Sequence, residues 1–158
     1  MLTETGNTNL IRTINSIKDL GVWLSDNFSF SQHYSISAKK AFRSLYFIKR
    51  SFSYIDKTSF ITLFSSYIRP HLEYCAQAAY SGLRKDLAII DKVQRKATKL
   101  VPQIRRLPYP DRLRELHLFS LDYRRIRGDL ILTFNLLHSG SFSEFFILAP
   151  TDQLRGHP

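Results

Sequence analysis

The chain has 158 residues, of which 44% are hydrophobic, so it is long enough to form one domain with a packed core. Its 23 lysines and arginines against 13 acidic residues give a formal net charge of +10. That imbalance indicates an acidic partner, for which nucleic acid is a commoner explanation than a membrane surface. The lone cysteine, Cys75, excludes an internal disulfide and a cysteine-rich zinc site, and we expect it to lie buried on the inner face of a helix.

Neither a metal site nor a membrane segment is expected from the sequence. The five histidines have no close His, Cys or Asp neighbours at metal-ligand spacing, so no metal or cofactor is predicted. The polar N-terminus does not have the pattern of a signal peptide, and no uninterrupted apolar run approaches the ~20 residues needed to cross a bilayer. We therefore expect an intracellular protein, nuclear or cytoplasmic, with an irregular lead-in at residues 1–15 and no membrane partner.

Residues 16–30 predict a β-hairpin, because Leu20, Val22 and Leu24 occupy every second position in its first half, as on one face of a strand. Within that alternation Gly21 indicates a bulge or the close approach of another backbone. A turn is expected at residues 25–27 and a short return strand at residues 28–30. Since a lone two-stranded hairpin is marginally stable in water, it must pack on the helices or pair with strands outside this chain.

Residues 31–51 predict a helix that is capped by Ser31. Apolar residues recur along it every three or four positions, which is the pattern of a buried helix face. This stripe consists of Tyr34, Ala38, Ala41, Leu45, Ile48 and Phe52. The cations Lys39, Arg43 and Arg50 lie on the opposite side of the helix, flanked by Lys40 and Lys49.

Residues 56–82 predict a second helix, because the carboxylate of Asp56 can accept a hydrogen bond from the first turn. Pro70 should bend this helix, since it removes the bond to the carbonyl of Ser66. Gly82 is expected to end the helix in the left-handed conformation. The predicted apolar stripe consists of Phe60, Leu63, Phe64, Tyr67, His71, Tyr74 and Ala78.

Residues 85–101 predict a third helix whose apolar and basic residues lie on different sides. The predicted buried side consists of Ile89, Ile90, Val93, Ala97, Leu100 and Val101. A second stripe consists of Lys92, Arg95, Lys96 and Lys99, and the neighbouring Asp91 lies off it. Such a stripe is either a solvated face or a phosphate-binding surface, and the spacing alone leaves both interpretations open.

A proline-containing linker follows, and then a short helix DRLRELHL is expected, with Pro110 as its first residue and Leu113 and Leu116 buried. A last long helix should begin after Ser120 and end at Gly140. Its predicted inner stripe consists of Ile126, Leu130, Phe134 and Leu137. Residues 141–158 are expected to form a loosely packed tail, with Phe142, Phe145 and Phe146 as the residues that could dock back on the helices.

Three arginines lie near the start of this last helix, where the helix dipole disfavours cations. They are Arg124, Arg125 and Arg127. They are expected to serve either a partner or a carboxylate such as Asp122 or Asp129.

Together these elements predict a mainly α fold: a short N-terminal β-hairpin followed by a bundle of four to five helices, the helical part covering residues 31–140. No phosphate-binding glycine loop, HExxH helix or nucleophile elbow is present in the sequence. The acidic residues are scattered, whereas two-metal phosphoryl transfer requires carboxylates that converge on both ions. We therefore expect no enzymatic activity from this chain alone.

Several sequence segments, in order and at matching spacing, resemble the C-terminal part of the reverse transcriptase of a non-LTR retrotransposon. They are KDLGVWLSDNFSFSQH (Lys18–His33), AKKAFRSLYFIKRSF (Ala38–Phe52), YIRPHLEY (Tyr67–Tyr74), KVQRKATKLV (Lys92–Val101) and LDYRRIRGDLI (Leu121–Ile131). The resemblance covers residues 17–140, most of the chain. It implies that residues 16–30 correspond to the end of the palm and residues 31–140 to a helical thumb.

The resemblance implies a role in binding nucleic acid. In that family the element that includes Leu20 and Gly21 is similar to the grip on the primer terminus, and the thumb closes over the RNA–DNA or DNA duplex backbone. The expected contact residues are Lys39, Lys40, Arg43, Lys49, Arg50, Lys92, Arg95, Lys96 and Lys99, with Arg124, Arg125 and Arg127 as second choices. If roughly six phosphates are contacted, the salt slope on duplex DNA should be near −5.

The family polymerises DNA on an RNA template with adjacent palm aspartates and Mg²⁺, and this sequence has no equivalent of that pair. The chain is therefore expected to be a fragment of an RNA-directed DNA polymerase that keeps the thumb-like module of this mobile element and lacks the catalytic centre. Two alternatives stay open: part of an active enzyme whose catalytic palm lies outside this chain, or a non-functional remnant. Trp23, Phe28 and Phe30 would form an exposed patch without a palm, which predicts self-association through the hairpin.

Overall fold

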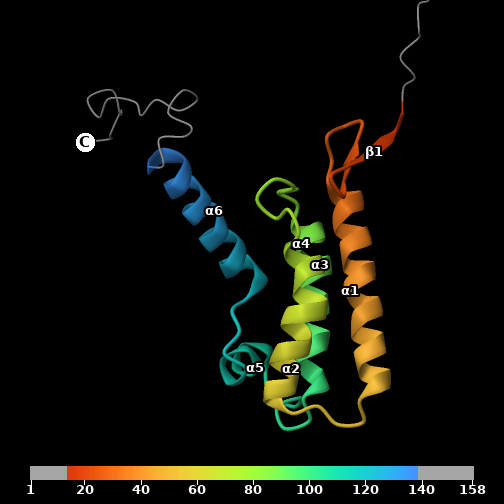
Figure 1. Ribbon diagram of the computed structural model, residues 1–158, viewed down its shortest axis with the longest axis vertical. Helices are drawn as coiled ribbons and strands as arrows, with labels where there is room; N and C mark the ends of the chain where they lie inside the picture. Colours follow the sequence, from red (N-terminus) through yellow and green to blue (C-terminus); the bar gives the residue numbers. More distant parts are fainter. Residues whose placement is uncertain (1–13, 139–158) are drawn as a thin grey trace, which may run out of the picture.

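The computed structural model describes residues 14–138 and shows a mainly helical chain that begins with a two-stranded antiparallel hairpin (Figure 1). The strands are β1 (Ser16–Asp19) and β2 (Val22–Ser25). The helices are α1 (Ser31–Ser51), α2 (Lys57–Leu63), the π-helical turn η1 (Phe64–Ile68), α3 (Arg69–Glu73), α4 (Arg84–Ala97), the 3₁₀ turn η2 (Thr98–Leu100), α5 (Tyr109–Glu115) and α6 (Leu121–His138). Because α2, η1 and α3 are continuous and η2 extends α4, these form five helical segments, and the predicted fold class is confirmed.

Helix α1, the continuous segment from α2 to α3, and helix α4 run side by side in alternating directions (Figure 1). Helix α1 packs against α4, α3 and η1, and β2 packs on the start of α1. Helix α5 lies near the end of α4, where it contacts η2. Between residues 14 and 138, no helix combines the length and the apolar character that crossing a membrane requires. The expected tail at residues 141–158, including Phe142, Phe145 and Phe146, and most of the expected lead-in lie outside the described residues.

The helix spacing read from the sequence is correct for α1. Its predicted stripe is buried from Tyr34 to Ile48, whereas Phe52, one residue beyond the helix, is exposed. Ser31 is not the cap: α1 starts at this residue, and its hydroxyl donates to the buried carboxylate of Asp86 on α4, at 2.7 Å. The predicted cap at Asp56 is confirmed, because its carboxylate accepts the backbone N–H groups of Thr58 and Ser59.

The second helix differs from its prediction in register and length. The buried stripe is Phe60, Phe64, Ile68 and Leu72, whereas the predicted Tyr67, Tyr74 and Ala78 are exposed. The π-helical turn immediately before α3 widens the backbone next to Pro70, so the proline needs no sharp break. The helix ends at Glu73, not Gly82, and Cys75 lies half-buried in the following turn with φ +53° instead of on a helix face.

The hairpin turns earlier than the sequence predicted. Leu20 and Gly21 have φ values of +43° and +86° and form the two-residue connection between β1 and β2. Two consecutive positive φ values match the twist of paired strands, which is why such turns favour glycine. The return strand is therefore β2 and not residues 28–30, and Gly21 is a turn residue and not a bulge.

Helix α6 is capped as predicted, with the Ser120 hydroxyl accepting the N–H of Tyr123 at 3.3 Å. Its predicted inner stripe, however, is exposed. Ile126 and Leu130 are 61% and 66% exposed, and Phe134 and Leu137 are also exposed. In Figure 1 the C-terminal part of α6 stands apart from the other helices, so within residues 14–138 no element covers this stripe.

Candidate nucleic-acid interface

A groove lies between the C-terminal ends of α1 and α4 and the loop after η2. It encloses about 680 Å³, and none of the described residues that line it is acidic. Its cations are Lys49, Lys96, Lys99 and Arg105, and its remaining lining residues are Phe42, Leu45, Tyr46, Phe52, Ser53, Ile55, Leu100 and Pro102. We call this feature the basic groove. It brings together cations from segments more than 40 residues apart in the sequence.

Local structure explains how each cation reaches the groove. Lys49 lies in the last turn of α1, and Lys96 in the last turn of α4. The ammonium group of Lys96 lies 5.2 Å from the centre of the Phe42 ring, so it spans the contact between the two helices. Such a contact holds the charge over an apolar wall without neutralising it.

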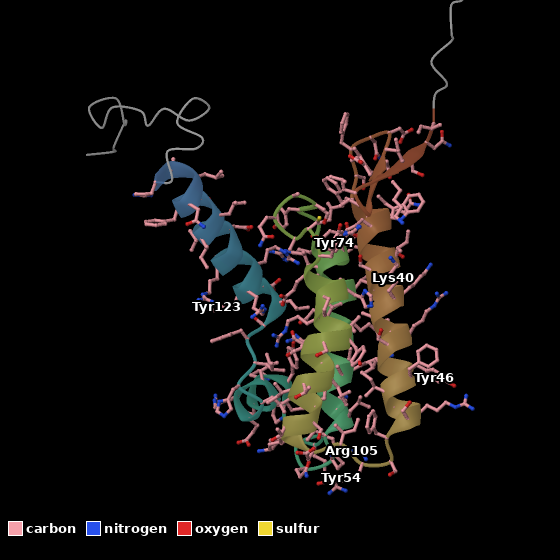
Figure 2. The ribbon with its side chains drawn as sticks, viewed as in Figure 1. Lys40, Tyr46, Tyr54, Tyr74, Arg105 and Tyr123 are labelled. Atoms are coloured by element: carbon pink, nitrogen blue, oxygen red, sulfur yellow. The ribbon has the colours of Figure 1, made fainter. Side chains whose placement is uncertain are left out.

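Arg105 enters the groove from the loop that follows η2. Val101 and Ile104 are almost fully buried on either side of a tight turn, in which Ile104 N–H donates to the Val101 carbonyl at 3.3 Å. These anchors fix the loop against the core and leave Arg105 exposed at the end of the bundle (Figure 2). Arg105 belongs to no periodic stripe, so the sequence pattern did not indicate it.

The remaining predicted cations of α1 are exposed on its outer surface. They are Lys39, Lys40, Arg43 and Arg50. Lys40 lies apart from the basic groove, in a smaller hollow that it lines with Lys18 of β1 and with His33, His71 and Tyr74. Lys92 of α4 is exposed as well. The basic surface is therefore wider than the groove, but the structure joins only Lys49, Lys96 and Lys99 of the predicted residues within it.

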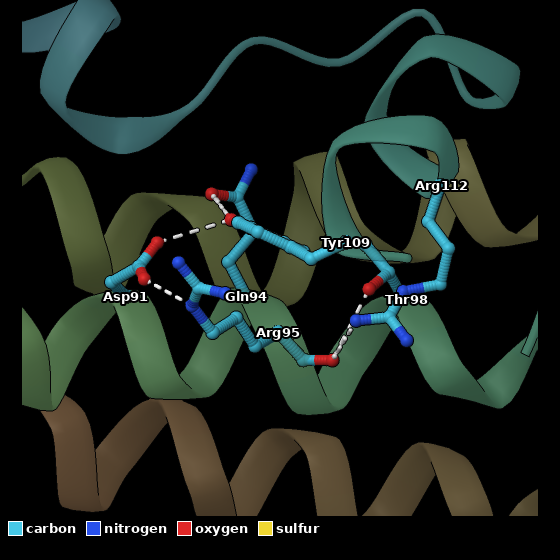
Figure 3. Close-up of polar contacts among 6 residues, drawn as sticks. All are labelled: Asp91, Gln94, Arg95, Thr98, Tyr109 and Arg112. Carbon is cyan, nitrogen blue, oxygen red and sulfur yellow. Dashed lines mark hydrogen bonds and ion pairs between the residues drawn. The ribbon is translucent and has the colours of Figure 1, made fainter. Parts of the chain in front are cut away.

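Arg95, a member of the predicted cationic stripe, contacts other residues of the protein (Figure 3). Its Nε donates to the Asp91 carboxylate, one helical turn away, and its guanidinium lies 4.1 Å from the centre of the Tyr109 ring on α5. The hydrogen bond to Asp91 raises the pKa of Arg95. With one face of the guanidinium on a ring and one edge on a carboxylate, Arg95 is a weaker candidate for phosphate binding than Lys96 or Lys99.

The same network ties α5 to the end of α4. The Tyr109 hydroxyl lies 2.8 Å from Gln94 Oε1 and 3.1 Å from Asp91 Oδ1. Burial, followed by the charge of Asp91, raises the pKa of Tyr109, so its hydroxyl stays a protonated donor. The buried Arg112 donates to the Arg95 carbonyl at 3.3 Å (Figure 3). These contacts hold the segment that carries Lys96 and Lys99.

Two of the three arginines near the start of α6 form ion pairs with carboxylates. Arg124 grips Glu73 of α3 with two parallel hydrogen bonds, one of them 2.8 Å long from Nη2 to Oε2, and this contact raises its pKa. Arg125 is 8% exposed and lies 3.5 Å from the Asp122 carboxylate, one of the two partners the sequence indicated. Arg127 is the exposed member of this trio.

The Leu20–Gly21 turn is held by Tyr74, the residue after α3, and does not line the basic groove. The Tyr74 hydroxyl donates to the Leu20 carbonyl at 2.5 Å. A Cβ on Gly21 would lie 3.0 Å from that hydroxyl, so the Tyr74 side chain would have to shift slightly, and the positive φ of this position favours glycine. The residue predicted to resemble a primer grip, Leu20, is 84% exposed. Of the predicted hairpin patch, Phe28 is exposed, whereas Trp23 is half-buried and Phe30 packs against the core.

Metal-binding groups are absent from the part of the chain that the structure describes: no three His, Cys, Asp or Glu residues gather there closely enough to hold an ion. Comparison of the chain with protein-family models, with curated protein sequences and with solved structures finds no match.

Proposed function

We propose that this chain binds the sugar–phosphate backbone of nucleic acid without sequence specificity, as a thumb-like fragment of a non-LTR retrotransposon reverse transcriptase. The observation that carries the binding proposal is the basic groove, where four cations converge and no described lining residue is acidic. The assignment to that polymerase family comes from the phrases of the sequence quoted above. The helical bundle with an N-terminal hairpin agrees with the fold that the resemblance implies.

The magnitude of the effect follows from the number of cations. Each phosphate neutralised by a lysine or arginine releases counterions, which gives a slope of about −0.9 per contact on duplex DNA in a plot of log K against log salt. Four groove cations therefore give a slope of about −4. Sequence-independent contacts of this kind give dissociation constants of about 10⁻⁴ to 10⁻⁶ M at physiological salt.

The cations have a competing structural explanation. Lys49 and Lys96 lie in the last turns of α1 and α4, where a positive charge also complements the helix dipole by about 0.3–1 kcal/mol. That role predicts an effect on folding stability and none on ligand affinity. Binding and melting measured on the same variants therefore separate the two explanations.

The test compares two double variants that each remove two charges from the α4–η2 segment. Lys96→Gln with Lys99→Gln removes both positive charges from the α4–η2 wall of the groove. Arg84→Gln with Lys85→Gln, the control, removes two charges from exposed residues at the other end of α4. Against an RNA–DNA hybrid duplex, we expect the first pair to flatten the salt slope by about 2 and the control pair to leave it nearly unchanged. Equal effects of the two pairs, in variants that melt like the parent chain, would remove the groove as the binding site.

A further inference from the structure

The basic groove carries aromatic rings as well as charges. Tyr46 is 59% exposed and lies one turn from Lys49, and Phe52 is 46% exposed just beyond the end of α1. The Tyr46 hydroxyl is also within 3.5 Å of Arg50 Nη1, so a cation outside the groove borders the same ring. Figure 2 shows Tyr46 projecting from α1 away from the bundle. The rings of Tyr46 and Phe52, with cations beside them, are available to a ligand.

From this arrangement we infer that the groove prefers single-stranded nucleic acid, whose unpaired bases stack on Tyr46 and Phe52 while the groove cations hold the phosphates. This inference rests on the proposed nucleic-acid binding and specifies its substrate class. A groove that combines a positive track for the backbone with exposed aromatic side chains is the arrangement that binds single strands without reading sequence. Every base has a π-face, so the contact tolerates any base.

The two exposed rings favour a single strand over a duplex, because only unpaired bases can stack on them. Tyr46 lies on α1, and Phe52 follows the last residue of that helix in an extended conformation. Neighbouring bases in a duplex strand are about 3.4 Å apart and remain stacked on each other. A duplex therefore offers its phosphates to Lys49, Lys99 and Arg105 but keeps its base faces away from both rings. A flexible single strand offers both at once.

The charge pattern favours nucleic acid over an apolar protein segment as the occupant. The groove has cations on both walls and in the loop between them, and none of its described lining residues could pair with a basic peptide. Exposed rings alone would suit an apolar peptide, but four neighbouring cations add a repulsive field that only an anionic ligand relieves.

The experiment uses the full chain with two probes, oligothymidine of twelve nucleotides and a twelve-base-pair duplex, each titrated across a salt series. The ring variants are Tyr46→Leu and Phe52→Leu, which keep apolar volume and remove the π-face. The matched control is Tyr67→Leu, because Tyr67 has the same 59% exposure but lies on η1 outside the groove. Thermal melting confirms that each variant is folded.

We expect the single strand to bind more tightly than the duplex. Each ring variant should weaken oligothymidine binding about tenfold, which is 1.4 kcal/mol within the range for stacking one base, and should leave its salt slope and the duplex affinity unchanged. Tyr67→Leu should change nothing. If both probes bind with steep salt dependence but the ring variants match the control, stacking is overturned and backbone binding stands. If neither probe binds the folded chain, the proposed function fails together with this inference.

Discussion

Replacing Tyr109 with phenylalanine tests whether the polar network between α4 and α5 fixes the segment that carries the groove cations. The Tyr109 hydroxyl shares its hydrogen between Gln94 and Asp91, at 2.8 and 3.1 Å. Asp91 keeps Arg95 as a partner after the change, whereas Gln94 is 1% exposed and its side-chain oxygen loses its donor. Leaving a buried acceptor unpaired costs about 1–3 kcal/mol of the free energy of unfolding.

For a chain of this length, each kcal/mol corresponds to about 2–4 °C, so Tyr109→Phe should lower the melting temperature by about 2–12 °C. Circular dichroism during heating and urea titration measures this change. Tyr54→Phe is the matched control, because Tyr54 is 60% exposed and its hydroxyl accepts a hydrogen bond from Gln103 at the surface. The control should stay within about 0.5 kcal/mol of the parent. Equal losses in the two variants would refute the reasoning.

Three further changes test the core, the α6 surface and the pH response. Phe60→Ala should lower the free energy of unfolding by about 3–5 kcal/mol, because the ring is 1% exposed and its loss leaves a cavity in the core. Phe134→Ser, on the exposed stripe of α6, should change the free energy of unfolding by less than about 0.5 kcal/mol. Urea titration measures both changes. Burial lowers the pKa of His33, the charge of Lys40 acts in the same direction, and a hydrogen bond to the Tyr74 backbone opposes them. The unfolded chain therefore binds this proton at higher pH than the folded chain, so the free energy of unfolding should fall as the pH drops below 6.5. Urea titration at several pH values should show a smaller fall for His33→Asn than for the parent chain.

The helices were predictable from the sequence because their signals are local. The spacing of Tyr34, Ala38, Ala41 and Leu45 determines which face of α1 is buried, and the carboxylate of Asp56 caps a helix wherever the rest of the chain lies. The short helix α5, with buried Leu113 on it and buried Leu116 directly after it, followed in the same way from Pro110 in its first turn and from the apolar spacing.

The errors arose where a local pattern admitted two structures. Aromatic residues occur on both faces of the second helix, so spacing alone favours Tyr67 and Tyr74 as core residues, whereas Ile68 and Leu72 are the buried ones. In α6 the periodic stripe showed which residues share a face, but periodicity does not show whether another element covers that face. Leu130 is exposed for this reason.

The sequence allowed the exposed cations to be predicted, but not which of them come together in one groove. Lys49, Lys96 and Lys99 share a groove because α1 packs on α4, which helix spacing does not determine. The ion pair between Arg124 and Glu73 joins residues 51 positions apart, so only the tertiary structure reveals it. By contrast, the pair of Asp91 and Arg95 has the i, i+4 spacing of a helical ion pair, and the sequence carried that signal.

Binding of the full chain to an RNA–DNA hybrid duplex across a salt series tests the central claim most directly, with thermal melting of the same sample to confirm folding. Four phosphate contacts in the basic groove predict a slope of log K against log salt of about −4. A cooperatively melting chain that binds neither the hybrid nor oligothymidine at low salt, or binds them with a slope near zero, would contradict the proposed function. In that case Lys49 and Lys96 would act on the stability of α1 and α4 alone.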